Sequence, residues 1–178
     1  MRFLANKQKG GIVWETIKFA IVVGLIVIPI RIYIAQPFIV NGLSMFPTFN
    51  NGDYLIIDEL SYNFLREPRR GEVIVFRPPL SGSRFFIKRV IGLPGETVEV
   101  KDGKVLVNGA VLSESYHEQV TAIDGVWELK EREYFVMGDN RGSSSDSRVW
   151  GVLPEDNIVG RAFLRLWPVS AAAYLPGQ

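Results

Sequence analysis

Two hydrophobic patterns divide the chain. Residues 12–35 are mostly apolar and include an uninterrupted apolar run at 19–30, whereas from residue 37 onward short apolar segments alternate with turn residues. A long apolar run favours a helix, and short segments rich in Val, Ile, Phe and Tyr favour strands. The pattern therefore predicts a mostly β domain behind one N-terminal helix.

Turn signals separate the expected strands of this domain. We expect strands at 38–40, 54–58, 72–76, 84–91, 97–101, 104–107, 125–129, 134–137 and 158–166. Asp102-Gly103 joins two alternating runs at the two-residue loop length that favours a type I′ turn, and Asn108-Gly109 repeats the signal. Short helical turns are expected at 59–65 and at 154–157, where a proline can occupy the first helical position.

The N-terminal segment has features of a membrane anchor. As a helix, residues 12–35 would reach roughly 36 Å, against about 30 Å for the hydrocarbon core of a bilayer. The run at 19–30 is also short enough for a signal-peptide core or a buried helix. However, no small-x-small cleavage site follows it, since a cut after Ala35 would leave the bulky Tyr33 where a small residue is needed.

Charge predicts the orientation of this anchor. Residues 1–11 contain Arg2, Lys7 and Lys9 and no acidic residue. By the positive-inside rule, this flank stays in the cytoplasm. We therefore expect a cytoplasmic N-terminus at 1–11, a transmembrane anchor at 12–35 and an extracytoplasmic domain at 36–178.

Composition narrows the chemistry of the domain. The chain has 178 residues, no cysteine, one histidine and a net charge of +1. It therefore cannot build a cysteine nucleophile, a thiolate zinc site, a disulfide or a multi-histidine zinc site. The charge gives no electrostatic footprint for nucleic acid. We expect no metal, cofactor or nucleic-acid partner, and His117 is expected in an exposed polar loop.

One serine stands at the end of an apolar strand in the stretch at 37–48. Ser44 lies between Gly42, which lets another backbone approach closely, and Pro47, which restricts the residue before it. A stiff turn presents a hydroxyl well, so Ser44 is a candidate nucleophile. The alternative is an ordinary turn serine.

A serine nucleophile needs a base, and here the remaining candidates are a carboxylate or a lysine. In the segment at 84–91, period-two alternation puts Lys88 and Arg89 on opposite faces, so the pattern does not say which charge is buried. Arginine stays protonated in proteins, so of these two only Lys88 can act as a base, and burial would make it neutral. The alternative is a lysine that reaches solvent from a strand edge.

A third unusual stretch, at 137–151, is dense in polar groups. Asp139 with Arg141, and Asp146 with Arg148, form two Asp-x-Arg units whose charge-assisted hydrogen bonds can pin the loop. A pinned polar loop can orient a lysine. The alternatives are a solvated loop and a calcium loop, and the spacing lacks the ligand pattern of an EF-hand.

The three stretches together resemble type I signal peptidase, the membrane-bound serine protease family that removes signal peptides from exported proteins. Residues 44–48 resemble its Ser-Met-x-Pro-Thr box, residues 88–96 its lysine box, and residues 138–148 its Gly-Asp-Asn-Arg-x-x-Ser-x-Asp-Ser-Arg box. One box would be a weak signal, but three in order behind an apolar segment are specific. The resemblance implies a signal-peptidase-like all-β catalytic domain behind one transmembrane helix.

The resemblance also implies roles for the site residues. Ser44 would attack the scissile carbonyl, and Lys88 would act as general base and then as general acid. Ser144 would hydrogen-bond the lysine, and further residues would brace the loop: Asp146, Arg148, Asp139 and Arg141. Gly42 stands where some family members carry a serine that adds its hydroxyl to the oxyanion hole. We therefore expect the Ser44 N–H to be the dominant donor.

A substrate is expected to bind as an added strand beside residues 38–41 and the segment that ends at Lys88. Shallow apolar pockets for small side chains would be lined by Phe38, Val40, Met45, Phe86 and Ile87. Residues 163–167 either form a core strand or add apolar surface that can rest in the membrane interface.

The expected partners are signal-peptide-bearing precursor proteins and the lipid bilayer. The expected location is a bacterial plasma membrane, with a thylakoid-type membrane as the alternative. The alternative function is a non-catalytic anchored module that binds export precursors. A self-cleaving repressor type is remote, because the chain has no DNA-binding half.

Overall fold

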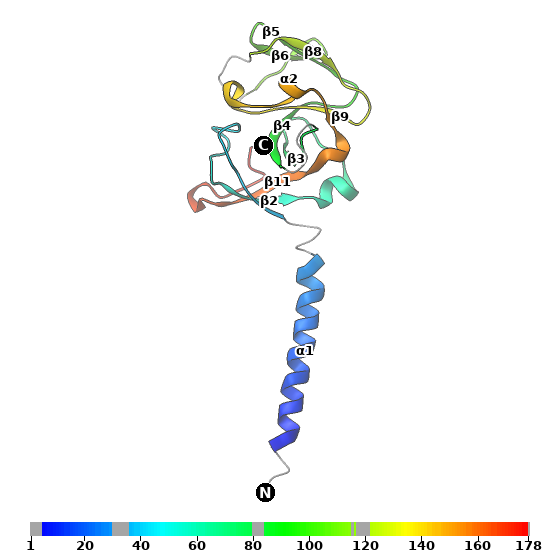
Figure 1. Cartoon of the computed structure of the whole chain (residues 1–178), viewed down its shortest axis with the longest axis vertical. Helices are drawn as coiled ribbons and strands as arrows, with labels where there is room; N and C mark the ends of the chain where they lie inside the picture. Colours follow the sequence, from blue (N-terminus) through cyan, green and yellow to red (C-terminus); the bar gives the residue numbers. More distant parts are fainter. Residues whose placement is uncertain (1–4, 30–35, 80–83, 115, 117–121, 178) are drawn as a thin grey trace.

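The computed structural model describes residues 5–29, 36–79, 84–114, 116 and 122–177. It has two parts, a long helix α1 (Ala5–Pro29) and a β-rich domain that begins with strand β1 (Gln36–Ile39) (Figure 1). The mostly β fold that the hydrophobic pattern predicts is confirmed.

Helix α1 overlaps the predicted apolar segment. The helix ends at Pro29, and the rest of the predicted segment, residues 30–35, lies outside the described residues. The apolar side chains described on this helix, from Ile12 to Leu25, are mostly exposed, as at Phe19 with 71% and Leu25 with 70% of its surface accessible. No helix in the described part of the chain combines the length and the apolarity needed to cross a bilayer.

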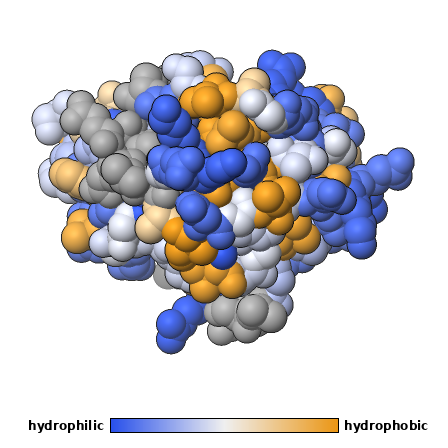
Figure 2. Space-filling view, turned by 90° about the horizontal axis from the view of Figure 1, so that it is seen from above, coloured by the Kyte–Doolittle hydropathy of each residue, from blue (hydrophilic) through white to orange (hydrophobic). Residues whose placement is uncertain are grey.

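Two antiparallel sheets form the domain. The larger has eight strands, in the order β1, β2 (Tyr54–Asp58), β11 (Ile158–Trp167), β3 (Val73–Phe76), β4 (Phe86–Gly92), β9 (Glu133–Met137) and β10 (Leu153–Pro154), with β12 (Ala173–Tyr174) paired to β11. The smaller has four, in the order β7 (Ala110–Val111), β6 (Lys104–Val107), β5 (Thr97–Lys101) and β8 (Gly125–Glu128). Seen from the end that carries β5, β6 and β8, the surface mixes hydrophilic residues with apolar patches (Figure 2).

Local sequence accounts for most strand positions. The predicted strands are all present; β2, β5 and β6 have the predicted bounds, and the others shift at their ends, as in β4, which begins at Phe86 and not at Arg84. Asp102 and Gly103 have φ values of 50° and 75°, which confirms the type I′ turn between β5 and β6. Strands β7, β10 and β12 were not predicted, because two residues are too few to show alternation.

Short helical turns connect the strands. Two of them, η2 (Ser61–Leu65) and η4 (Glu155–Asn157), fall inside the predicted helical turns. Three more were not predicted: η3 (Arg141–Ser143), α2 (Ser147–Trp150) and η5 (Val169–Ala171). Helix α2 starts in the polar loop because the side chain of Asp146 accepts a hydrogen bond from the N–H of Arg148 at its N-terminus.

The centre of the larger sheet is covered on both faces. All four residues of β3 are buried, and so are the last five of β4. One cluster of buried side chains packs around Met45, Phe49 and Leu55, and another around Ile74, Val90 and Val136. A central strand of this kind has no solvent-facing side, so the two charged residues of β4 are both buried, Lys88 at 4% and Arg89 at 1% exposure.

Candidate active site

Ser44 lies in a tight turn that directly follows β1. The turn is held on both sides, because Val40 N–H donates to the carbonyl of Asp53 at 2.9 Å and Gly42 N–H donates to Oδ1 of Asn51 at 2.9 Å. Met45, the residue after Ser44, is only 1% exposed and anchors the turn in the core. Ser44 itself is half-buried, so its hydroxyl is presented from a fixed backbone.

Lys88 meets Ser44 from strand β4. Its Nζ donates to Oγ of Ser44 at 2.8 Å and to the carbonyl of Ile87 at 2.8 Å. The ring of Phe86 covers the amine, with its centroid 5.3 Å from Nζ. The fold therefore brings together the two side chains that the sequence singled out as nucleophile and base.

Burial decides the protonation of this lysine. Removal from water lowers the pKa of Lys88 from an ordinary 10.5 to about 8, although the carboxylates of Asp146 and Asp139 partly oppose the shift. A lysine with this pKa is partly neutral at mildly alkaline pH. It can therefore accept a proton from a hydroxyl at hydrogen-bond distance.

Arg89 points to the other face of β4 and is fully paired there. Its Nε donates to Oδ1 of Asp139 at 2.8 Å, and its Nη2 donates to Oδ2 of the same carboxylate at 2.6 Å. Its Nη1 donates to the carbonyls of Gly71 and Gly177. The hydroxyl of Thr48 also donates to Asp139, at 2.5 Å, so this ion pair connects β4, the polar loop and the turn that carries Ser44.

The two predicted Asp-x-Arg units behave differently. Asp146 and Arg148 bind each other, with Nε of Arg148 donating to Oδ1 and Nη2 to Oδ2 of Asp146, both at 2.8 Å. Asp139 and Arg141 do not bind each other, because Asp139 binds Arg89 and Arg141 binds the carboxylate of Glu114. Both arginines are buried and still hold the loop, but Arg141 does so through a partner far away in the sequence.

Ser144 is close to the Ser44–Lys88 pair but is not bonded to it. Its Oγ is buried and has no hydrogen-bond partner among the described residues, so the expected bond to Lys88 is not formed. A side chain at Gly138 would clash with Oγ of Ser144 and with the carbonyl of Ser44. Glycine at this position thus allows the polar loop to pack directly against the turn that carries Ser44.

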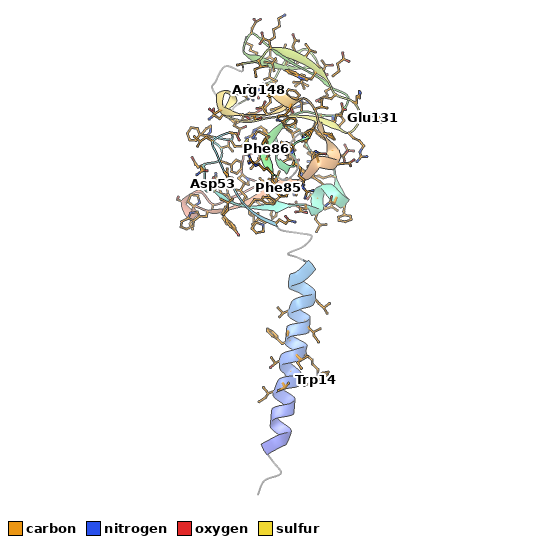
Figure 3. All side chains as sticks on the ribbon, viewed as in Figure 1. Trp14, Asp53, Phe85, Phe86, Glu131 and Arg148 are labelled. Carbon is orange, nitrogen blue, oxygen red and sulfur yellow. The ribbon has the colours of Figure 1, made fainter. Side chains whose placement is uncertain are left out.

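A groove of about 530 Å³ opens beside Ser44 and Lys88. Four of the predicted substrate-binding residues line it, Phe38, Val40, Phe86 and Ile87, whereas Met45 does not because its side chain lies in the core. Figure 3 shows Phe85 and Phe86 together in the middle of the domain, and Arg148 nearer the smaller sheet. Ile39, Asn41, Arg84 and Phe85 also line the groove and lie in the two segments expected beside the substrate, whereas three lining residues were not predicted: Leu55, Val75 and Ser145.

The sequence indicated these further lining residues of the groove to different degrees. Ile39 and Asn41 were indicated by the stretch expected beside the substrate and not by alternation, which places them on the face opposite to Phe38 and Val40. Leu55 and Val75 come from strands far along the chain and had no local signal.

His117, which the sequence placed in an exposed polar loop, lies outside the described residues.

Gly42 leaves the region around the backbone N–H of Ser44 without an added side chain. Its φ is +95°, a conformation that disfavours any other residue, and a Cβ built there would have no atom within 4 Å. Among the described residues, no atom takes the place of a side chain at Gly42.

Comparison with known proteins gives a consistent result. Residues 13–167 match the model of the family described as signal peptidase, peptidase S26. The probable signal peptidase I-2 of Synechocystis sp. is 43% identical over 157 residues, which is 85% of this chain and 72% of that protein. The thylakoidal processing peptidase 1 of Arabidopsis thaliana is 36% identical over 167 residues, which is 88% of this chain and 49% of that protein.

One solved structure of a signal peptidase I is also similar to this chain. The crystal structure of a signal peptidase I from Enterococcus faecalis V583 aligns with a TM-score of 0.49 at 36% identity, over 54% of this chain and 97% of that one.

Proposed function

Because the chain belongs to the peptidase S26 family of signal peptidases, which are serine peptidases, we propose that Ser44 and Lys88 form its catalytic dyad and that it cleaves signal peptides from exported precursors. The observation that carries this proposal is the hydrogen bond of 2.8 Å from Lys88 Nζ to Ser44 Oγ. The lowered pKa of Lys88 supports it, since a base must be neutral before it can take a proton.

The proposed reaction has two steps. Neutral Lys88 takes the proton of Ser44 while Oγ bonds to the scissile carbonyl carbon, and the carbonyl oxygen becomes an oxyanion next to the Ser44 N–H. The Lys88 ammonium then gives its proton to the leaving amine, and an acyl-enzyme ester remains on Ser44. Water attacks the ester with Lys88 again as base, which releases the carboxylic acid and restores Ser44.

The groove supports an extended substrate. Strand β1 stands at the end of the strand order of the larger sheet, so its outer edge is open among the described residues for an added strand. Phe38, Val40, Phe86 and Ile87 would contact alternate substrate side chains. Apolar side chains this close to Ser44 fit small residues next to the cut.

The polar loop would orient the base. Asp146 and Asp139 lie near enough to Lys88 to raise its pKa against the effect of burial, and their own partners, Arg148 and Arg89, hold them in place. Arg141 braces the loop through Glu114. Ser144 has a free acceptor, and we propose that it receives an N–H of Lys88 when the lysine turns toward the leaving amine.

We further propose that residues 12–35 anchor the protein in a membrane and that the outer face of β1, β2 and β11 rests against it. Ile39 and Trp167 each pair with Tyr54 across this sheet, so all three side chains share a face, and Ile39 and Trp167 are 58% and 61% exposed. Such an exposed apolar face suits a lipid interface. The domain would lie outside a bacterial plasma membrane, with a thylakoid-type membrane as the alternative.

The test is cleavage of a precursor with an Ala-x-Ala site by the full chain in detergent. We expect the wild type to release the signal peptide and Ser44→Ala and Lys88→Ala to leave the precursor intact. Cleavage by both variants would refute the dyad. Tight capture of uncleaved precursor by the wild type would instead indicate a binding module.

A further inference from the structure

Asn140 makes two hydrogen bonds to the turn that carries Ser44, and neither involves Lys88. The side-chain Nδ2 donates to the carbonyl of Leu43 at 3.1 Å, and the backbone N–H donates to the carbonyl of Ser44 at 3.0 Å. One residue of the polar loop therefore holds the carbonyls on both sides of Ser44.

The side-chain bond fixes a peptide plane. The carbonyl of Leu43 and the N–H of Ser44 belong to one trans peptide unit, so they point in opposite directions. Phe46 N–H donates to the same carbonyl of Leu43 at 3.1 Å, and the two donors together restrict rotation of the unit. The Ser44 N–H itself has no hydrogen-bond partner among the described residues, so it points away from Asn140 and remains available.

This orientation matters because Gly42 supplies no second donor. An oxyanion hole works only when its donors already point at the position that the developing negative charge will occupy. With the Ser44 N–H as the dominant donor, any freedom of its peptide plane reduces transition-state stabilisation directly. The geometry points to Asn140 as the positioning residue of the oxyanion hole, an inference that rests on the proposed function.

The inference predicts a specific kinetic change. Removing an oxyanion donor costs roughly 10²–10³ in kcat, so loosening one should cost less, about 10- to 100-fold. For Asn140→Ala we expect kcat to fall by that amount, whereas KM should stay within about twofold of the wild type. The pH midpoint of the reaction should not move, since Asn140 is not among the groups that shift the pKa of Lys88.

Asn157→Ala is the matched control. Nδ2 of Asn157 also donates to a backbone carbonyl across two loops, that of Arg77, at 2.7 Å, but it does not line the groove beside Ser44. We expect this variant to keep the kcat of the wild type. Asn140→Asp keeps the size of the side chain and removes both N–H groups of Nδ2, while the backbone N–H remains. It gives a second test if the alanine variant does not fold. Its kcat is measured on the alkaline plateau and should fall at least as far.

A peptide aldehyde provides a readout that a purely structural role would not change. Oγ of Ser44 adds to the aldehyde carbon, its proton passes to Lys88, and the former carbonyl oxygen occupies the oxyanion position. We expect Asn140→Ala to weaken aldehyde inhibition by the same factor as kcat/KM, and to leave binding of the corresponding uncleaved peptide alcohol unchanged.

Each outcome decides the inference. It is overturned by an unchanged kcat in both Asn140 variants, by an equal loss in Asn157→Ala, or by aldehyde inhibition that stays at the wild-type level while kcat falls. The proposed function fails separately, if the wild type does not cleave precursor or Ser44→Ala still does.

Discussion

The two faces of strand β4 carry neighbouring buried basic side chains that have different hydrogen-bond partners. Arg89 is held by both oxygens of Asp139 and by two backbone carbonyls, whereas Lys88 has only the hydroxyl of Ser44 and one carbonyl. No carboxylate among the described residues lies within ion-pair distance of Lys88. Burial without a paired charge lowers the pKa of Lys88 to about 8.

The difference shows that burial alone does not make a reactive group. Both side chains are nearly inaccessible, so the distinction comes from the partners and from the chemistry of the head group. A guanidinium keeps its proton even when it is desolvated, and its planar donors suit a carboxylate. An amine left with neutral partners gives up its proton more easily. Arg89 therefore stabilises the site through its ion pair, whereas Lys88 has the partners and the pKa that the proposed general base requires.

The largest effect is expected from a variant that has an arginine on both faces of β4. Lys88→Arg keeps a cation beside Ser44 that cannot lose its proton, so kcat/KM for precursor cleavage at pH 9 should fall at least about 10³-fold. Lys104→Arg, on an exposed position of β6, is the control and should keep wild-type activity. If Lys88→Arg retained a tenth of the activity, a lysine base would be excluded.

Next in size is the loss of the partner of Arg89. Asp139→Ala leaves a buried guanidinium without its carboxylate, and the free energy of unfolding should decrease by about 3–5 kcal/mol. Urea denaturation followed by circular dichroism measures this change. Asp156→Ala removes one partner of an ion pair in which both side chains are exposed, and it should change stability far less. Equal effects in the two variants would contradict the structural role of the Arg89 pair.

On the Lys88 face of β4 we expect a smaller loss of folding stability, which depends on pH. Lys88 binds its proton less tightly when folded, with a pKa near 8 against an ordinary 10.5, so its charged form destabilises the fold fully below pH 8. The cost disappears as the pH rises from 8 to 10.5. Lys88→Met should therefore gain about 3 kcal/mol more stability at pH 7 than at pH 10.5. A gain that does not depend on pH would show that Lys88 is not desolvated.

The smallest change, counted per pH unit, is expected in the pH dependence of kcat/KM for the wild type. If neutral Lys88 is required, kcat/KM should rise about tenfold per pH unit below 8 and level off above it. Initial rates with one precursor across pH 5 to 10 measure the profile, and a pre-steady-state burst experiment establishes whether chemistry limits the rate. A flat profile at acid pH with rate-limiting chemistry would rule out a lysine base.

The sequence predicted the local features well. Alternation and the Asp102-Gly103 turn located strands and a hairpin, since both depend only on neighbouring residues. The three boxes indicated the family, which the match over residues 13–167 confirms. The scarcity of histidine and the absence of cysteine left a carboxylate or a lysine as the base, the resemblance to signal peptidases pointed to Lys88, and the fold brings its Nζ within 2.8 Å of Ser44 Oγ.

Long-range partners could not be predicted in the same way. Two adjacent Asp-x-Arg units look equivalent along the chain, yet only Asp146 and Arg148 bind each other, because Asp139 faces Arg89 on β4 and Arg141 faces Glu114. Met45 was expected in the groove, but the turn buries it in the core. Such choices depend on which strands become neighbours.

By itself, the sequence determined the set of groups available for chemistry and the β character of the domain, since residue types and turn signals are local properties. Only the tertiary structure decided that β4 is a central strand and therefore that both Lys88 and Arg89 are buried. It also decided which of the two cations meets a carboxylate. Desolvation and pairing arise from distant segments that pack together, and these two effects separate a lysine with a lowered pKa from an ion-paired arginine one residue away.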